Sequence, residues 1–247
     1  MTNGLLALTN DITKVQLISD DRLNLGETAA WLIALLALAF SIYQYFSTTR
    51  VKRLEYLDSL AVSLREEPLL RAATIMLDWE VRTLEVEDKF YAYNVLLLPR
   101  ALLAQNAPTP ESGTASAGFD ETEVFIRDAF DTLFAFFENV QYAVHLGILK
   151  QADIYEAPMH YYLGKLVEKD AWTDGAITRY LEQYGFPKAK KLVNQYRDKI
   201  PAPGKLTPEQ KLIFEAAFLE EIKKAREANA DREHLRHSTP ASARERA

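Results

Sequence analysis

The longest apolar run of the chain lies near its N-terminus. Residues 28–49 carry no charged side chain, and the run stops at Arg50, Lys52 and Arg53. After its first residue, twelve consecutive positions are apolar, so a helix formed here has no polar face to turn toward water. At 1.5 Å per residue, Thr28 to Phe46 spans about 28 Å, close to the hydrocarbon thickness of a bilayer. The pattern predicts a transmembrane helix over residues 28–49.

Two other interpretations of this run are weaker. A cleaved export signal begins close to a basic N-terminus, whereas 27 residues with several acidic side chains precede this run. A buried helix of a soluble protein would show a polar face within five turns. Aromatic side chains near both ends of the run suit the two membrane–water interfaces. We therefore expect these side chains to anchor the chain in the bilayer: Trp31, Leu35, Leu38, Phe40, Tyr43, Tyr45, Arg50, Lys52 and Arg53.

Basic residues beside the run predict its orientation. Four lie on its C-terminal side and two on its N-terminal side, namely Arg50, Lys52, Arg53 and Arg65 against Lys14 and Arg22. Because positive side chains are retained in the cytoplasm, we expect the body after the run to be cytoplasmic. The sequence thus predicts a single-pass protein of the inner membrane. Residues 1–27 form a short tail, read either as an interfacial amphipathic segment or as a flexible end.

Apolar positions after the membrane run recur mostly at steps of three and four, as in amphipathic helices. The stripe from Leu54 to Leu64 predicts a helix that continues to Pro68, where proline stops it. This stripe either packs on the body or pairs with a second copy. Further helices are expected over residues 69–84 and 90–103, followed by a loop over residues 106–119 that is rich in Pro, Ser, Thr and Gly.

The strongest amphipathic segment follows this loop. Asp120 and Glu123 have the spacing of a capping box at its start, and Gly147 suits its end. Its large apolar side chains fall on one face and predict the centre of the core: Ile126, Phe130, Leu133, Phe137 and Val140.

Shorter helices are expected over residues 151–157, 159–169, 176–184 and 187–199, with Pro and Gly at their junctions. A C-terminal amphipathic segment covers residues 201–236, with Thr207 as the helix cap, and a polar tail covers residues 237–247. The predicted fold is therefore all-α: an N-terminal transmembrane helix, a cytoplasmic helical domain over residues 50–200 and a C-terminal helix.

Composition removes several classes of function. The chain has no cysteine, which excludes disulfides, thiolate metal sites and a cysteine nucleophile. Its net charge of −6 makes nucleic acid an unlikely partner, because phosphate binding needs a concentrated cationic surface. Phosphate-binding and nucleophile-elbow motifs are absent from the sequence, and we expect no cofactor.

Candidate chemistry is limited to a few polar side chains. Glu138 and His145 share one face of the central helix, but about 10 Å separates two turns, too far for them to bind one metal unaided. Glu156 and His160 are four residues apart, with Asp153 nearby, yet Pro158 interrupts them. These residues either form a polar site or belong to a hydrogen-bonded surface, and we expect no metal.

The central stretch FDTLFAFFENVQYAVHLGILKQADIYEAPMHYYLGKLV resembles the DUF4760-type bacterial membrane proteins. A Phe-rich helix, then Glu, a Gly-Ile-Leu turn and an acidic-aromatic helix carry the resemblance, which is clearest over residues 130–172. It implies a bacterial, single-pass, all-helical protein of unassigned activity, and it supplies no catalytic residues.

Three functions are compatible with this organisation. The first is a membrane-anchored scaffold or sensor whose cytoplasmic body binds a protein partner or self-associates. The second is a membrane-disrupting effector of a bacterial stress or antiviral defence system. The third is an enzyme with a polar site around Asp153, Glu156 and His160. The expected partners are the lipid bilayer and either another protein or further copies of this chain.

Overall fold

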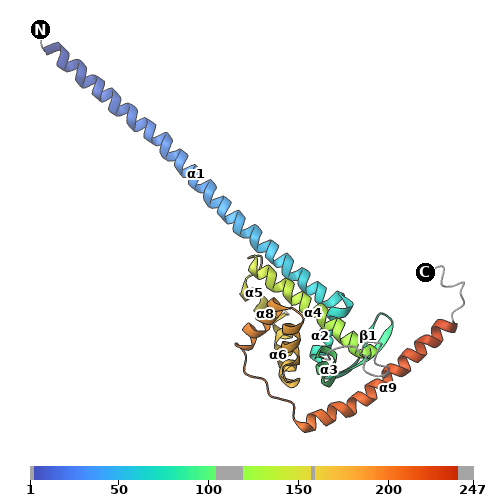
Figure 1. The fold of residues 1–247 in the computed structure, drawn as a ribbon. Coiled ribbons are helices and arrows are strands. Elements are labelled where there is room, and N and C mark those ends of the chain that lie inside the picture. The colour runs from blue at the N-terminus through green and yellow to red at the C-terminus, as the bar shows by residue number, and fades with distance from the viewer. Residues whose placement is uncertain (1–2, 104–118, 157–158, 239–247) are drawn as a thin grey trace, which may run out of the picture. The chain divides into compact units, whose positions relative to one another are not determined.

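The computed structural model describes the backbone of residues 3–103, 119–156 and 159–238 (Figure 1), and the side chains of residue 26 and of residues 28–103, 119–155 and 159–234. It divides into two compact units, Met1–Tyr56 and Leu57–Ala247. The predicted loop at 106–119, except for Phe119, and residues 239–247 of the predicted tail lie outside the described residues. The fold is helical with one small hairpin, so the predicted all-α class is confirmed.

The first unit is helical throughout its described length. It belongs to α1 (Asn3–Glu66), which includes the backbone of residues 3–27. The side chains of residues 28–52 are all exposed, and the apolar stretch that begins at Thr28 is long enough to cross a membrane. The unit therefore contains a candidate membrane span, which begins at Thr28. The last turns of α1 lie in the second unit, where Leu60 and Leu64 are buried.

The second unit packs short helices around a long central helix, and a second long helix follows at its C-terminal end. Pro68 ends α1 as predicted, because it becomes the first residue of the next helix. The elements follow in the order α2 (Pro68–Asp78), β1 (Val81–Val86), β2 (Lys89–Asn94), η1 (Val95–Leu97), α3 (Leu98–Leu103), α4 (Glu121–His145), α5 (Gln151–Glu156), α6 (Met159–Trp172), α7 (Ala176–Gln183), α8 (Pro187–Arg197) and α9 (Pro208–Ser238).

Helix α4 is the centre of the core. The predicted capping box is confirmed: the Asp120 carboxylate accepts from the Glu123 N–H at 2.8 Å, and Glu123 accepts from the Asp120 N–H at 3.1 Å. Gly147 follows the helix with a φ of +73°, which suits glycine. The five core side chains named from the sequence are all 0% exposed: Ile126, Phe130, Leu133, Phe137 and Val140.

A β-hairpin replaces parts of two predicted helices. The helices expected over residues 69–84 and 90–103 are wrong after Asp78 and before Leu98, where β1 and β2 pair antiparallel and a short 3-10 turn follows. Both strands are rich in β-branched and aromatic residues, which favour strand. The residues at the two-residue turn, Glu87 and Asp88, have φ of 46° and 68°, the backbone that a tight hairpin needs.

The remaining helices lie close to their predicted positions. Within the C-terminal segment predicted over residues 201–236, the regular helix begins at Pro208, directly after the predicted cap. Thr207 caps it as predicted: its hydroxyl accepts from the Gln210 N–H at 3.2 Å, and the Gln210 side chain accepts from the Thr207 N–H at 2.9 Å. Figure 1 shows α9 running beside the hairpin.

Candidate functional site

The candidate membrane span exposes large apolar side chains along its whole length. Trp31 is 71% exposed near one end, and Tyr43 is 70% exposed near the other. None of the most apolar 18-residue window is covered by protein. Because such a surface is unfavourable in water, it needs a covering of lipid or of another chain.

Glu138, predicted as part of a polar site, caps helix α8. Its Oε1 atom accepts from the backbone N–H groups of Lys188 at 2.6 Å and Ala189 at 2.7 Å. The residue at the cap position of α8, Phe186, has no side-chain acceptor. Helix starts leave N–H groups without intrahelical partners, so α8 takes its cap from α4.

The other residues of the predicted polar site have separate roles. Asp153 caps its own helix by accepting from the Lys150 N–H at 2.7 Å. His145 is exposed in the last turn of α4. His160 is exposed and lies 3.0 Å from the Tyr196 hydroxyl through Nδ1. The Glu156 side chain lies outside the described residues.

These positions do not form one site. Glu138 contacts the first turn of α8, whereas His160 contacts Tyr196 in its last turn. Seven residues of helix separate those contacts by about 10 Å. Across the described part of the chain, no group of three His, Asp or Glu side chains is arranged to hold a metal ion.

The face of α4 that carries His145 is a packing face over much of its length. The Tyr180 hydroxyl of α7 donates to Asp131 at 2.5 Å. Burial raises the pKa of Asp131, while the hydrogen bond from Tyr180 opposes that rise. Burial and the bond to Asp131 also raise the pKa of Tyr180. The polar side chains of this face therefore join α4 to α7 and α8.

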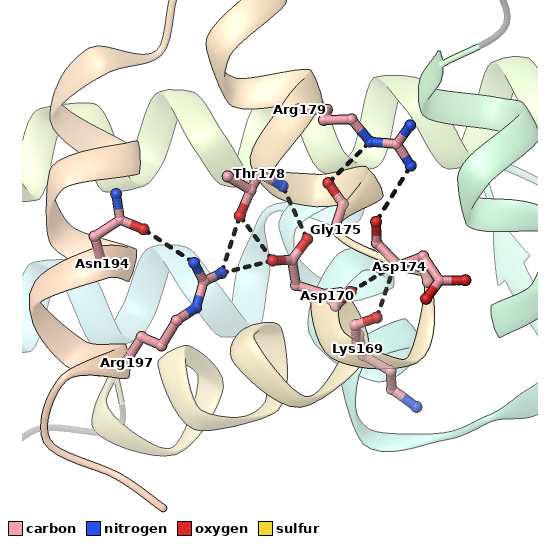
Figure 2. Close-up of polar contacts among 9 residues, drawn as sticks. Lys169, Asp170, Asp174, Gly175, Thr178, Arg179, Asn194 and Arg197 are labelled. Carbon is pink, nitrogen blue, oxygen red and sulfur yellow. Dashed lines mark hydrogen bonds and ion pairs between the residues drawn. The ribbon is translucent and has the colours of Figure 1, made fainter. Parts of the chain in front are cut away.

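The densest polar cluster was not anticipated from the sequence (Figure 2). The Asp170 carboxylate, only 5% exposed, accepts from the Thr178 N–H at 2.9 Å and the Thr178 hydroxyl at 2.7 Å. Arg197 donates to the same carboxylate at 2.6 Å and to the Thr178 hydroxyl at 2.9 Å. Asn194 accepts a further bond from Arg197 at 3.2 Å. One carboxylate thus joins α6, α7 and α8.

A weak sequence signal points to this cluster. The residue at the cap position of α7 is Gly175, which has no side chain to cap the helix. A helix that begins without its own cap needs an acceptor from elsewhere. This signal indicates that the helix start needs an acceptor from elsewhere, but it does not identify Asp170 as the residue that supplies it.

A buried cation lies next to Asp170. Lys169 is 0% exposed, and its Nζ atom lies 3.2 Å from the Trp79 carbonyl and 3.4 Å from Glu80 Oε1. It also lies 4.6 Å from the ring centre of Trp172. Burial lowers the pKa of Lys169, and the nearby Glu80 carboxylate opposes that change. The side chain links α6 to the segment before β1.

Helix α9 is attached to the hairpin through polar contacts at both strand edges. On β1, the Thr83 N–H donates to Glu221 Oε2 at 2.7 Å. On β2, Phe90 donates its N–H to Asn229 at 2.8 Å and accepts from the same amide at 2.9 Å. In this register, Thr83 and Phe90 are positions whose backbone groups point away from the partner strand.

Further contacts extend this attachment along the hairpin. Asn94 donates to the Phe214 carbonyl near the start of α9 at 3.2 Å. Near its end, Arg232 pairs with Glu85 and with Asp88, the latter at 3.2 Å. Unpaired strand edges are a liability, because they can pair with another chain. Side chains of α9 fill part of both edges, and we call this set of contacts the α9 clasp.

Comparison with known protein families, with curated proteins and with solved structures finds no match for this chain.

Proposed function

We propose that the protein is a membrane-anchored scaffold or sensor of a bacterial inner membrane. The exposed apolar stretch that begins at Thr28 is the observation that carries this proposal. In the proposed orientation, Arg50, Lys52 and Arg53 remain in the cytoplasm together with the second unit. The second unit is then the part that binds a protein partner or further copies of the chain.

The use of polar groups in the second unit supports a binding role over catalysis. Asp170, Glu138 and Asp153 each complete the start of a helix. Of the residues expected in an enzyme site, Asp153 caps its own helix and His160 contacts Tyr196. A body held together in this way can present a surface to a partner.

Helix α9 offers such a surface. Phe214 and Glu221 lie toward the hairpin, whereas Leu212, Ile213 and Leu219 are 66%, 64% and 70% exposed. Neighbouring exposed apolar side chains are typical of places where another protein binds.

Single cysteines test the location and orientation, because the natural chain has none. We would introduce Thr9→Cys and Glu209→Cys separately and add a membrane-impermeant maleimide to intact cells. Labelling of Thr9→Cys alone, with both sites labelled after lysis, is the expected result. Labelling of Glu209→Cys in intact cells would reverse the orientation. Disulfide cross-linking of the same variants in membranes would report self-association.

A charge in the span tests the anchor itself. Leu38→Arg is expected to release the chain from membranes during carbonate washing, because arginine at the centre of a span costs about 2.5–3.5 kcal/mol on insertion scales. Leu212→Arg is the matched control, since it also replaces an exposed leucine but lies outside the span. Release of both variants, or of neither, would count against a lipid-embedded span.

A further inference from the structure

A cavity of about 300 Å³ lies between β2, the start of α4 and α9. Its walls include Phe90 and Tyr91 from β2, Thr122 from α4, and Phe218 and Ile222 from α9. That volume is at the lower end of the range of about 300–1,000 Å³ for small-molecule sites. The cavity is thus large enough for a small ligand and too small for a peptide.

The wall of the cavity combines apolar and polar surface. Its apolar part comes from seven residues of β2, η1 and α9, namely Phe90, Tyr91, Ala92, Leu97, Phe218, Ile222 and Ala225. The Tyr91 ring stacks on Phe125 with centroids 4.1 Å apart, which fixes one side of the wall. A hydrocarbon chain would bury apolar area here on both itself and the protein.

The rim carries charges of both signs, and one exposed cation has no counterion among the described residues. Lys89 pairs with Glu121, and the Asp120 carboxylate accepts from the Glu123 N–H. Arg226 lines the same cavity, and among the described residues it has no hydrogen bond or ion pair. A guanidinium is well suited to bind a carboxylate through two parallel hydrogen bonds.

We propose that this cavity binds a small amphipathic anion, an alkyl chain that ends in a carboxylate. The chain lies against Phe218 and Ile222, and the carboxylate binds Arg226. This inference rests on the proposed sensor role and gives it a ligand class. A membrane-tethered body stands beside a store of such molecules, since fatty acids partition into bilayers.

The position of the cavity connects binding to the α9 clasp. Asn229, which holds both backbone groups of Phe90, also lines the cavity. A ligand in the cavity would therefore contact β2 and α9 together and stabilise their association. Binding would then change how firmly α9 is attached, which is the signal that a partner can read.

Photolabelling of the full chain in phosphatidylcholine nanodiscs tests the site. The probe is decanoic acid with a diazirine near its methyl end, and labelled peptides are mapped by mass spectrometry. We expect labelling in β2 and in the segment of α9 around Phe218. Excess decanoate should compete with the probe, whereas decanol, which has the same chain length but no charge, should compete at least about tenfold more weakly.

Three variants test whether the charge of Arg226 contributes to binding. Arg226→Gln should weaken decanoate binding about tenfold, as expected for loss of one charge-assisted contact. Lys223→Gln is the matched control, because it removes a cation from α9 at a position that does not line the cavity. Arg226→Glu should exchange the preference, so that decylamine competes better than decanoate.

Specific results would overturn the proposal. Labelling confined to Thr28–Phe46 would mean that the probe only partitions into lipid beside the span. Equal competition by decanol, or unchanged binding in Arg226→Gln, would leave no role for the anion. Carbonate extraction of the same samples separates the two ideas: a chain that stays in the membrane but takes no label contradicts the ligand and leaves the anchor standing.

Discussion

The Asp170 carboxylate of α6 accepts hydrogen bonds from both the backbone N–H and the hydroxyl of Thr178 in α7. It therefore supplies the cap that Gly175 cannot provide. Glu138 does the same for α8, where Phe186 occupies the cap position. Two consecutive helices thus depend on carboxylates from other helices, so their ends are fixed by tertiary packing rather than by local sequence.

Removing the shared carboxylate should destabilise the second unit. Asp170→Ala leaves the Thr178 N–H without its acceptor in a largely buried place and removes the ion-pair partner of Arg197, so we expect a loss of about 2–4 kcal/mol. Denaturant unfolding of the full chain in detergent, followed by circular dichroism, measures the change. The control is Asp174→Asn, an exposed partner of Lys205, for which no measurable change is expected. Equal effects of the two substitutions would contradict a structural role for Asp170.

Replacing the buried cation should do little harm. In Lys169→Met the apolar stem is kept and the unfavourable burial of a charge is removed, so the free energy of unfolding at neutral pH should stay the same or rise by up to about 2 kcal/mol. Lys169→Ala should instead lower it by about 2–3 kcal/mol, because it leaves a cavity. A large loss in Lys169→Met would show that the ion pair with Glu80 outweighs the burial of its charge.

The lowered pKa of Lys169 also predicts a pH dependence. The folded protein releases this proton at a lower pH than the unfolded chain, whose lysine has an ordinary pKa of 10.5. Between the two pKa values the unfolded state binds more protons, so stability rises with pH in that window. Unfolding measured at increasing pH up to 10.5 should show this rise in the natural chain relative to Lys169→Met. Stability curves of the natural chain and Lys169→Met that run parallel over this pH range would contradict the prediction.

Loss of the Glu138 cap should be distinguishable from loss of a functional site. Glu138→Ala should lower the free energy of unfolding by about 1–2 kcal/mol, because two N–H groups of α8 lose their acceptor. Glu138→Gln, which keeps an acceptor oxygen, should lose less. His145→Gln should change nothing measurable, since that side chain is exposed. Thermal unfolding of the three variants tests the order, and a His145 variant as unstable as Glu138→Ala would contradict it.

Acid should loosen the α9 clasp. Although partial burial opposes it, hydrogen bonds from Lys224 and Thr83 lower the pKa of Glu221 below its ordinary 4.5. The contribution of this carboxylate is therefore complete above pH 4.5 and is lost as the pH falls through the lower, folded-state pKa. Hydrogen exchange of α9 amides, corrected for the intrinsic rate at each pH, should show falling protection in the natural chain. Glu221→Gln should lack that acid-dependent step, whereas Glu220→Gln, at an exposed neighbour, should retain it.

Local patterns in the sequence were sufficient for much of the fold. The apolar run after Thr28, the capping box at Asp120 and Glu123, and the stripe through Phe130 and Phe137 depend on residues close together in the chain. Helical periodicity and capping act over three or four positions, so they can be read without knowing the rest of the molecule. The hairpin carried a readable signal too, in the strand-favouring residues on either side of Glu87 and Asp88.

Tertiary structure alone decided what the polar side chains do. Thr83 and Glu221 are 138 residues apart, and Asp170 and Arg197 are 27 apart. Nothing local distinguishes these side chains from solvent-exposed ones, because their partners come near only when the helices pack. The sequence by itself therefore determined the helices and the candidate membrane span. Packing determined which carboxylates cap which helices, and where α9 meets the hairpin and encloses a cavity.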